Sequence, residues 1–174
     1  MEDECNAKCS AFNLKPIGFV RTRHRDDEIS ESFEGVDGTI EILDDFSAGL
    51  EGLEGFSHIL VVAYLHKIPL DARKAMMVKP KWLVKYAEDP RSIPEVGVFA
   101  TRSPHRPNPI ALSVVRLIER EGKNLKVDDL DLYDGTPVLD LKPYIPLNCC
   151  VRFPAWFLEM QKKVRDTKGK ELTF

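Results

Sequence analysis

The chain has 174 residues and is 43% hydrophobic, enough for one buried core with a short terminal extension. Its formal net charge of −3 excludes a generally basic nucleic-acid-binding protein, so an RNA site would need positive charge gathered on one face or assembled across subunits. No apolar run approaches about 20 residues, and the acidic start is unlike a signal peptide. We therefore expect a cytoplasmic protein that does not enter a membrane.

The first segment, residues 1–13, is expected to be a flexible N-terminus. It contains Cys5 and Cys9, and the other two cysteines are the adjacent Cys149 and Cys150. The spacing of the first pair suits a metal ligand set, but adjacent cysteines are awkward ligands. We expect four free thiols in a reducing compartment and no metal site.

Short apolar or β-branched runs bounded by Gly, Asp or Pro predict strands along most of the chain. They cover residues 17–20, 39–43, 59–65, 113–118, 125–132 and 138–141. Residues 121–124 are typical of a hairpin turn, and residues 46–53 of a short helical insertion. This pattern predicts a mainly β fold: a small antiparallel β-barrel domain over residues 14–146, with short helical insertions and a C-terminal helix.

Residues 68–96 differ in character, because four prolines, two methionines, two aromatic residues and six cations replace the strand pattern. We expect an excursion from the barrel with little regular structure. Cations interleaved with aromatic rings suit single-stranded nucleic acid, so Lys79, Lys81 and Lys85 are candidate RNA-binding residues. An irregular connection that covers one end of the barrel explains the same composition equally well.

Residues 147–174 are predicted to form a helical extension with a basic end. Four apolar residues share one helical face after Pro154, a good first-turn residue: Trp156, Phe157, Met160 and Val164. We expect an amphipathic helix docked on the domain, and contact with a partner chain or with RNA is the alternative.

Residues 97–113, GVFATRSPHRPNPIALS, have the clearest functional character. Three prolines alternate with polar residues, and proline fixes its own φ and keeps the preceding residue out of the α region. The resulting path is stiff, extended and cationic, as expected for the wall of an anion or nucleotide pocket, with a solvated surface loop as the alternative. Arg102 is the first candidate for a ligand contact, because a planar guanidinium suits a carboxylate or a purine face. Arg106 is a further candidate for binding RNA.

The same residues resemble the signature of the TsaA-like family of S-adenosylmethionine-dependent transfer RNA methyltransferases. Two further stretches resemble the family in the same order: residues 49–58, GLEGLEGFSH, and residues 134–146, DGTPVLDLKPYIP. These matches are long and nearly gapless. The resemblance implies a small β-barrel that binds S-adenosylmethionine.

The resemblance also carries S-adenosylmethionine contacts onto several segments: Arg102, His66, Lys67, Leu112, Asp128, Asp129, Leu130 and Asp131. Further contacts fall on Ile29, Ser30 and Glu31, in the loop after the first strand, although the Pro and Gln that family members usually carry there are absent. Carboxylates in residues 128–131 could accept ribose hydroxyls or balance a sulfonium charge, and their spacing does not match a calcium-binding EF-hand loop. Residues 134–137 are typical of a tight turn in which Asp134 bonds its own backbone and Gly135 takes a positive φ.

Methyl transfer from a sulfonium is an in-line displacement that needs no metal, so such a protein mainly positions donor and acceptor. By resemblance, the acceptor is N6-threonylcarbamoyladenosine next to the anticodon of tRNA. The alternatives are a noncatalytic module that binds S-adenosylmethionine or RNA, and a small-molecule methyltransferase with residues 68–96 as a lid. No catalytic residue is identified, and Asp134, Lys142 and Tyr144 are candidates. We expect a homodimer with Tyr144, Trp156 and Phe157 as aromatic anchors.

Overall fold

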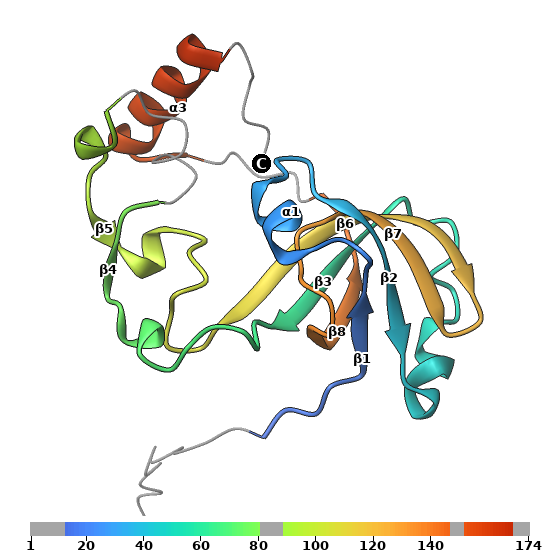
Figure 1. Cartoon of the computed structure of the whole chain (residues 1–174). Helices are drawn as coiled ribbons and strands as arrows, with labels where there is room; N and C mark the ends of the chain where they lie inside the picture. Colours follow the sequence, from blue (N-terminus) through green and yellow to red (C-terminus); the bar gives the residue numbers. More distant parts are fainter. Residues whose placement is uncertain (1–12, 81–88, 147–151, 169–174) are drawn as a thin grey trace, which may run out of the picture. The chain divides into compact units, whose positions relative to one another are not determined.

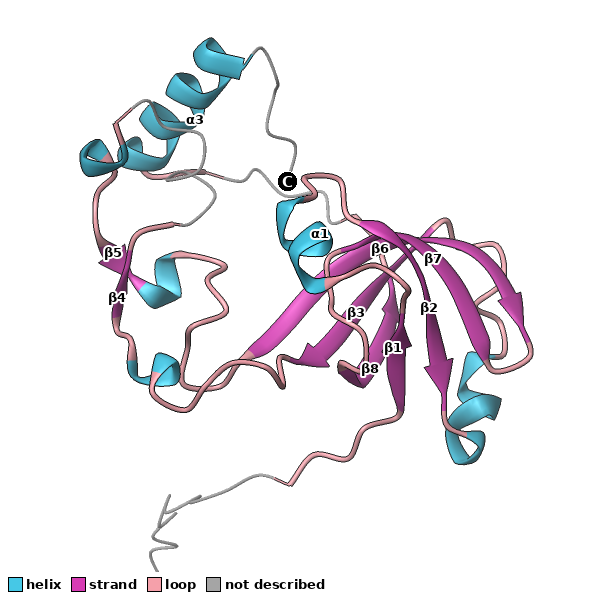
Figure 2. Ribbon diagram, in the orientation of Figure 1, coloured by secondary structure: helices cyan, strands magenta, loops and turns pink. Residues whose placement is uncertain are grey.

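A computed structural model describes residues 13–80, 89–146 and 152–168. Six of its strands close into a barrel in the order β1-β2-β7-β6-β3-β8 (Figures 1 and 2). They are β1 (Gly18–Arg21), β2 (Val36–Ile42), β3 (His58–Tyr64), β6 (Ile110–Glu121), β7 (Asn124–Leu130) and β8 (Pro137–Pro143). The expected mainly β fold, a small antiparallel barrel, is thereby confirmed.

The barrel interior is filled by alternate residues of its strands, most clearly in β3. In β3, Ile59, Val61 and Ala63 are fully buried while the residues between them are half-buried, because successive side chains of a strand point to opposite faces. Val20, Ile40, Val115, Leu125 and Val138 fill the same core from the other strands. The hairpin turn expected at residues 121–124 joins β6 to β7, and Gly122 adopts φ +61° there.

Residues 26–31 form a short helix, α1 (Asp26–Glu31), where the sequence indicates only a loop. Its first turn is acidic, and the Glu28 carboxylate accepts the backbone N–H of Arg25 at 2.8 Å. Ile29 is 3% exposed and is the only residue of α1 in the core. A single buried residue gives no helical periodicity, which is why the helix was not predicted.

The stretch 49–58 has an architectural role. It begins within the 3₁₀ turn η1 (Asp44–Leu50), near the short helical insertion expected at residues 46–53. Arg120 of β6 pairs with Glu51 at 2.8 Å and with Glu54, and its Nη1 donates to the Leu50 carbonyl at 3.3 Å. The side chain of Arg120 is only 15% exposed, so these pairs clamp the stretch against the barrel wall.

The chain divides into two compact units, which we describe separately. The barrel unit is residues 1–64 and 111–144, and the second unit is residues 65–110 and 145–174. The domain expected over residues 14–146 therefore contains residues of both units.

Regular structure in the second unit is short up to its C-terminal helix. Its elements are η2 (Ala72–Lys74), β4 (Met77–Val78), η3 (Pro90–Ser92), β5 (Val96–Gly97), η4 (Val98–Ala100) and α3 (Ala155–Lys168). β4 and β5 form a two-stranded antiparallel sheet. In α3, which follows Pro154 as expected, Met160 is 5% exposed, and the rings of Trp156 and Phe157 pack edge to face with their centroids 5.6 Å apart.

No helix of the described residues is long and apolar enough to cross a membrane. All four cysteines lie outside the described residues.

Candidate functional site

One end of the barrel collects most of the candidate residues of the barrel unit. At this end, the α1 end, strands β1, β3 and β7 finish and β2, β6 and β8 begin, as the antiparallel pairings require. It carries α1, the start of β6 and the turn between β7 and β8. The opposite end carries η1 and is called the η1 end.

The acidic stretch 128–131 forms an irregular end of β7 at the α1 end. The register between β2 and β7 shifts there, and Asp129 is the one described non-glycine residue with a positive φ, at 63°. Gly35 packs so closely on it that a Cβ on Gly35 would lie 2.3 Å from the carbonyl carbon of Asp129. Bulges and left-handed non-glycine residues recur beside binding sites. They turn side chains in directions that a regular strand does not allow.

The side chains of this stretch point in different directions. Leu130 is fully buried, so only its backbone could meet a ligand. Asp128 is paired with Arg116 of β6, and its Oδ1 accepts the backbone N–H of Asp129 at 3.1 Å. Asp131 is exposed, and its Oδ1 accepts the hydroxyl of Ser113, which is 4% exposed. The end of the Pro-rich motif, residues 97–113, is therefore tied to the end of β7.

The three candidates of α1 differ in accessibility. Ile29 belongs to the core, whereas Ser30 and Glu31 are exposed. The hydroxyl of Ser30 donates to the Asp27 carbonyl at 3.1 Å. Gly35, four residues after Glu31, packs against the backbone of Asp129. The segment that follows α1 therefore contacts the acidic stretch. Leu112 is 61% exposed, near the start of β6 at the same end.

The three catalytic candidates are not brought together. Asp134 lies at the α1 end, where its Oδ1 accepts the backbone N–H of Thr22 at 3.0 Å. The tight turn is present, with Gly135 at φ +74°, but the expected bond from Asp134 to its own backbone is replaced by this longer-range bond. Lys142 pairs with Asp140 at 2.7 Å, and the backbone N–H of Tyr144 donates to His58 at the η1 end. Strand β8, roughly 20 Å long, separates Asp134 from Tyr144.

In the second unit, Arg106 holds the Pro-rich loop together. Its guanidinium donates to three backbone carbonyls: Ser103 at 2.9 Å, Thr101 at 2.6 Å and Val98 at 3.2 Å. The hydroxyl of Thr101 donates to the Val98 carbonyl at 2.8 Å and accepts the backbone N–H of Ser103 at 3.1 Å. This network holds the backbone of residues 98–106 in addition to the restraint from its prolines. We accordingly regard Arg106 as a positioning residue for the loop.

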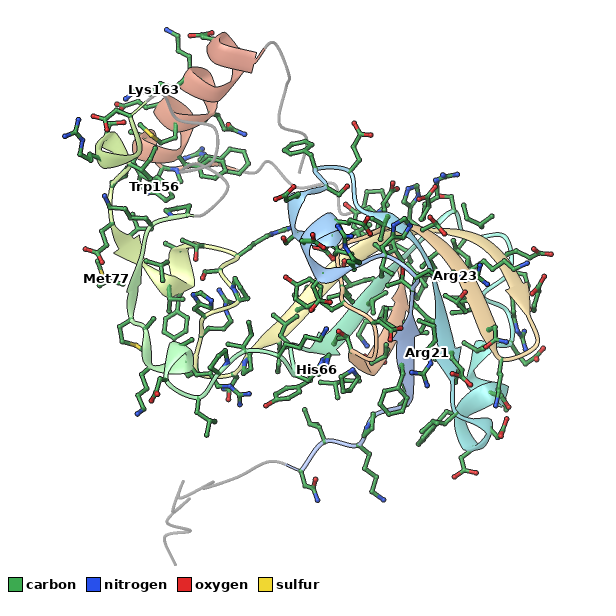
Figure 3. All side chains as sticks on the ribbon, in the orientation of Figure 1. Arg21, Arg23, His66, Met77, Trp156 and Lys163 are labelled. Atoms are coloured by element: carbon green, nitrogen blue, oxygen red, sulfur yellow. The ribbon has the colours of Figure 1, made fainter. Side chains whose placement is uncertain are left out.

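Arg102 is held by this loop and is itself exposed. Within the described residues its guanidinium has no hydrogen bond or ion pair, so it is available to a ligand. His66 and Lys67, which follow β3, are also exposed, although each has an interaction of its own (His66 is labelled in Figure 3).

Charge is segregated between the two units. The second unit contains 15 Lys or Arg and 7 Asp or Glu, a net charge of +8, whereas the barrel unit contains 10 and 21, a net charge of −11. Lys79 is exposed and lies close enough to Asp89 to contribute to the lowered pKa of that carboxyl, after the larger effects of the Arg91 backbone N–H and side chain. Lys81 and Lys85 lie outside the described residues. The excess of positive charge therefore belongs to the second unit.

Several residues of this architecture were missed from sequence. Arg116, Arg120 and Gly35 act through partners far away in the chain, which no local pattern reveals. Phe99 belongs to the Pro-rich motif, but nothing in the sequence says that its ring is 78% exposed.

The sequence that forms the barrel and the Pro-rich motif matches a known family. Residues 25–148 match the model of the tRNA-methyltransferase O N-terminal domain. The chain belongs to this family, which confirms the resemblance noted from sequence.

The relatives include archaeal and bacterial proteins. An S-adenosyl-L-methionine-binding protein of Archaeoglobus fulgidus is 39% identical over 141 residues, which cover 79% of this chain and 93% of that one. The tRNA (adenine(37)-N6)-methyltransferase of Escherichia coli is 33% identical over 147 residues, covering 79% of this chain and 59% of the enzyme. A probable S-adenosyl-L-methionine-binding protein of Pyrococcus abyssi is 39% identical over 136 residues, which are 76% of this chain and 67% of that one.

Solved structures agree. A crystal structure of TrmO superposes with a TM-score of 0.61 at 35% identity, covering 81% of this chain and 61% of that one. TrmO from Pseudomonas aeruginosa gives 0.56 at 33% identity, covering 81% and 59%. The chain thus spans about three fifths of the TrmO chains that it matches.

Proposed function

We propose that this protein is an S-adenosylmethionine-dependent methyltransferase that acts on a modified adenosine of tRNA. The observation that carries the proposal is the Ser113–Asp131 hydrogen bond, which joins the two motifs assigned to donor binding at one end of the barrel. The names of the relatives support the same donor and the same class of acceptor.

The residues present fit the donor. In the barrel unit, Asp131 offers the ribose hydroxyls an exposed carboxylate with one oxygen fixed by Ser113. Ser30, Glu31 and Leu112 are further proposed contacts of this unit, and Ile29 supports α1 from the core. In the second unit, Arg102 suits the donor carboxylate, since it is exposed without a partner among the described residues, and His66 and Lys67 are the other proposed contacts.

S-adenosylmethionine, when bound, supplies a methyl group attached to a sulfonium sulfur. When the methyl group is transferred, the rest of the donor leaves as a neutral thioether. The protein's part is to hold the acceptor in line with that methyl group and to exclude water. The acidic barrel unit suits a cationic sulfonium, because its net charge of −11 lowers the energy of positive charge nearby. Asp134 is the catalytic candidate that stands at the α1 end, beside the proposed donor contacts, while Lys142 and Tyr144 stand at the other end.

For the acceptor we propose N6-threonylcarbamoyladenosine next to the anticodon. The Escherichia coli relative, whose name places its methyl group on the N6 of adenine 37, supports this assignment. The net charge of +8 on the second unit supports an RNA acceptor over a small molecule. A noncatalytic binding module would keep the donor contacts and show no turnover.

Two measurements test the proposal. The purified chain is incubated with methyl-labelled S-adenosylmethionine and tRNA that carries or lacks the threonylcarbamoyl group, and nucleosides are then analysed by mass spectrometry. A methyl group on the modified adenosine alone is the expected result. Donor binding by calorimetry without methylation of any RNA would leave the binding-module alternative, and no donor binding would reject the donor assignment.

We also propose that the protein is a cytoplasmic homodimer. Outward-facing apolar residues of β6 support self-association, since Val114 and Ile118 are 38% and 50% exposed, and Tyr144 adds a ring that is 46% exposed. Trp156 and Phe157 are half-buried in α3 and offer less free surface. Light scattering should give twice 19.8 kDa, and a mass of 19.8 kDa at micromolar concentration would reject the dimer.

A further inference from the structure

Phe99 has an environment that the stability of the fold does not explain. It stands in η4 between Val98, which is 1% exposed, and Ala100, and its own ring is 78% exposed. Within the described residues the ring has no contact with another aromatic ring or with a cation. A large apolar side chain held in water gains nothing from the hydrophobic effect, which favours burial.

The backbone around Phe99 is nevertheless held firmly. The N–H of Val98 donates to the Met76 carbonyl at 2.9 Å, beside the β4–β5 sheet. The carbonyl of Val98 accepts from the backbone N–H of Thr101 at 3.2 Å, from its hydroxyl at 2.8 Å and from Arg106 at 3.2 Å. Residues on both sides of Phe99 are thus anchored, so the backbone that carries the ring is held in place.

The charge of the unit that carries the ring points to its ligand. This unit has a net charge of +8, and its exposed cations include Lys79, a candidate RNA-binding residue. An exposed aromatic ring on a firmly held loop of a cationic unit is the arrangement on which proteins stack unpaired bases while cations meet the phosphates.

We propose that Phe99 is a stacking platform for an unpaired base of the RNA substrate. The inference rests on the proposed action on RNA and assigns to the ring a part in substrate binding, with no part in donor binding. Arg106 supports it as a positioning residue, because its three hydrogen bonds fix the loop that carries the ring.

The test compares Phe99→Ala and Phe99→Trp with the native chain. Phe46→Ala is the matched control, since Phe46 is another exposed phenylalanine of a 3₁₀ turn, 39% exposed in η1, and belongs to no proposed site. The probe is a fluorescein-labelled anticodon stem-loop, and its affinity is measured at several salt concentrations. Calorimetry with S-adenosylmethionine and light scattering are run on every variant.

Phe99→Ala should weaken binding of the stem-loop at least about fivefold, the lower bound for loss of one base stack. The dependence of affinity on salt should be unchanged, because the cations that meet the phosphates all remain. Phe99→Trp should bind as well as the native chain or better, Phe46→Ala should bind as the native chain does, and donor affinity should be the same in all four.

Native affinity of Phe99→Ala for the stem-loop would overturn the inference, even if the native chain methylates tRNA. A loss of donor affinity would move the ring to the donor site, and a changed oligomeric state would place it in an interface between copies; either result rejects the platform. If the RNA affinity falls as expected but no RNA is methylated, the platform stands and the proposed reaction fails. If the native chain binds no RNA, both fail.

Discussion

The hydroxyl of Ser113 donates a hydrogen bond to the carboxylate of Asp131, eighteen residues further along the chain. Ser113 is 4% exposed and Asp131 is exposed, so a buried donor fixes the orientation of a carboxylate at the surface. One oxygen of Asp131 is thereby occupied and the other is left for a ligand. An acceptor oriented before binding loses less conformational entropy when the ligand arrives.

Ser113→Ala should weaken S-adenosylmethionine binding by about 1 kcal/mol, or roughly fivefold, because the Asp131 carboxylate is then free to rotate. Calorimetry measures this effect. Ser47→Ala is the matched control, since it also removes a hydroxyl hydrogen bond, at 2.8 Å to Asp44, but at the η1 end. Equal donor affinity in the two variants would show that the orientation of Asp131 by Ser113 does not contribute to donor binding.

Arg102→Ala should weaken donor binding by about 1.5–3 kcal/mol, the usual contribution of a hydrogen bond to a charged group. Arg102→Lys should recover only part of this loss, because a lysine keeps the charge but loses the planar fork. Arg91→Ala, which removes an exposed arginine of the same unit, should leave affinity unchanged. Native affinity in Arg102→Ala would remove this residue from the donor site.

Gly35→Ala should destabilise the fold by about 2–5 kcal/mol, since it adds a Cβ 2.3 Å from the Asp129 backbone at a φ of +82°. Gly122→Ala, at φ +61° with open space around it, isolates the conformational part and should cost about 1 kcal/mol. Urea denaturation followed by circular dichroism measures both. Similar losses in the two variants would mean that the close approach of Gly35 to Asp129 is easily relieved.

Glu54 should make stability depend on acid. Its own backbone N–H and then the Arg120 side chain hold its pKa below the ordinary value of 4.5. The stabilising effect of its ionised form is therefore complete above about pH 4.5 and is lost as the pH falls through the lowered pKa. In Glu54→Gln the fall in melting temperature between pH 5 and pH 3 should be shallower than in the native chain. A fall of equal steepness would contradict the assignment.

Lys79→Ala should flatten the dependence of RNA affinity on salt. Each phosphate that no longer meets a cation reduces the logarithmic slope by about 0.7 for a single strand, because fewer counterions are released. The triple replacement of Lys79, Lys81 and Lys85 should flatten it further and lower methylation of tRNA, with donor affinity unchanged. A triple variant that methylates normally would leave residues 68–96 as a cover of the barrel.

The strands could be predicted because each one is a short run of apolar or β-branched residues, which can be read from neighbouring positions in the sequence. In β3 the apolar run from Ile59 to Ala63 marks a strand in the sequence itself, although only the structure shows that Ile59, Val61 and Ala63 face the core. Helix α1 escaped because only Ile29 is buried, although its run of acidic first-turn residues is a start signal that could have been weighed. The division into two units escaped because it depends on contacts between residues far apart in the chain.

The candidate site was predictable where a motif covers it and unpredictable where partners are distant. Asp131 was named from sequence, but its bond to Ser113 was not. Asp128 was named as a ligand contact, and its pairing with Arg116 of the neighbouring strand was not predicted. The left-handed backbone of Asp129 also leaves no trace in residue type, since aspartate is compatible with both regions of φ.

The closure of the barrel has a consequence for biosynthesis. Gly18 of β1 pairs with Val138 of β8, 120 positions later, so the first strand lacks one neighbour until the last strand has been translated. At about 5–20 residues per second this takes roughly 6–24 seconds. Once Tyr64 has been added, β1, β2 and β3 are complete while the apolar faces that they will bury have nothing to close on. The nascent chain should therefore need chaperone cover on the ribosome, for a time set by the rate at which residues 65–138 are synthesised.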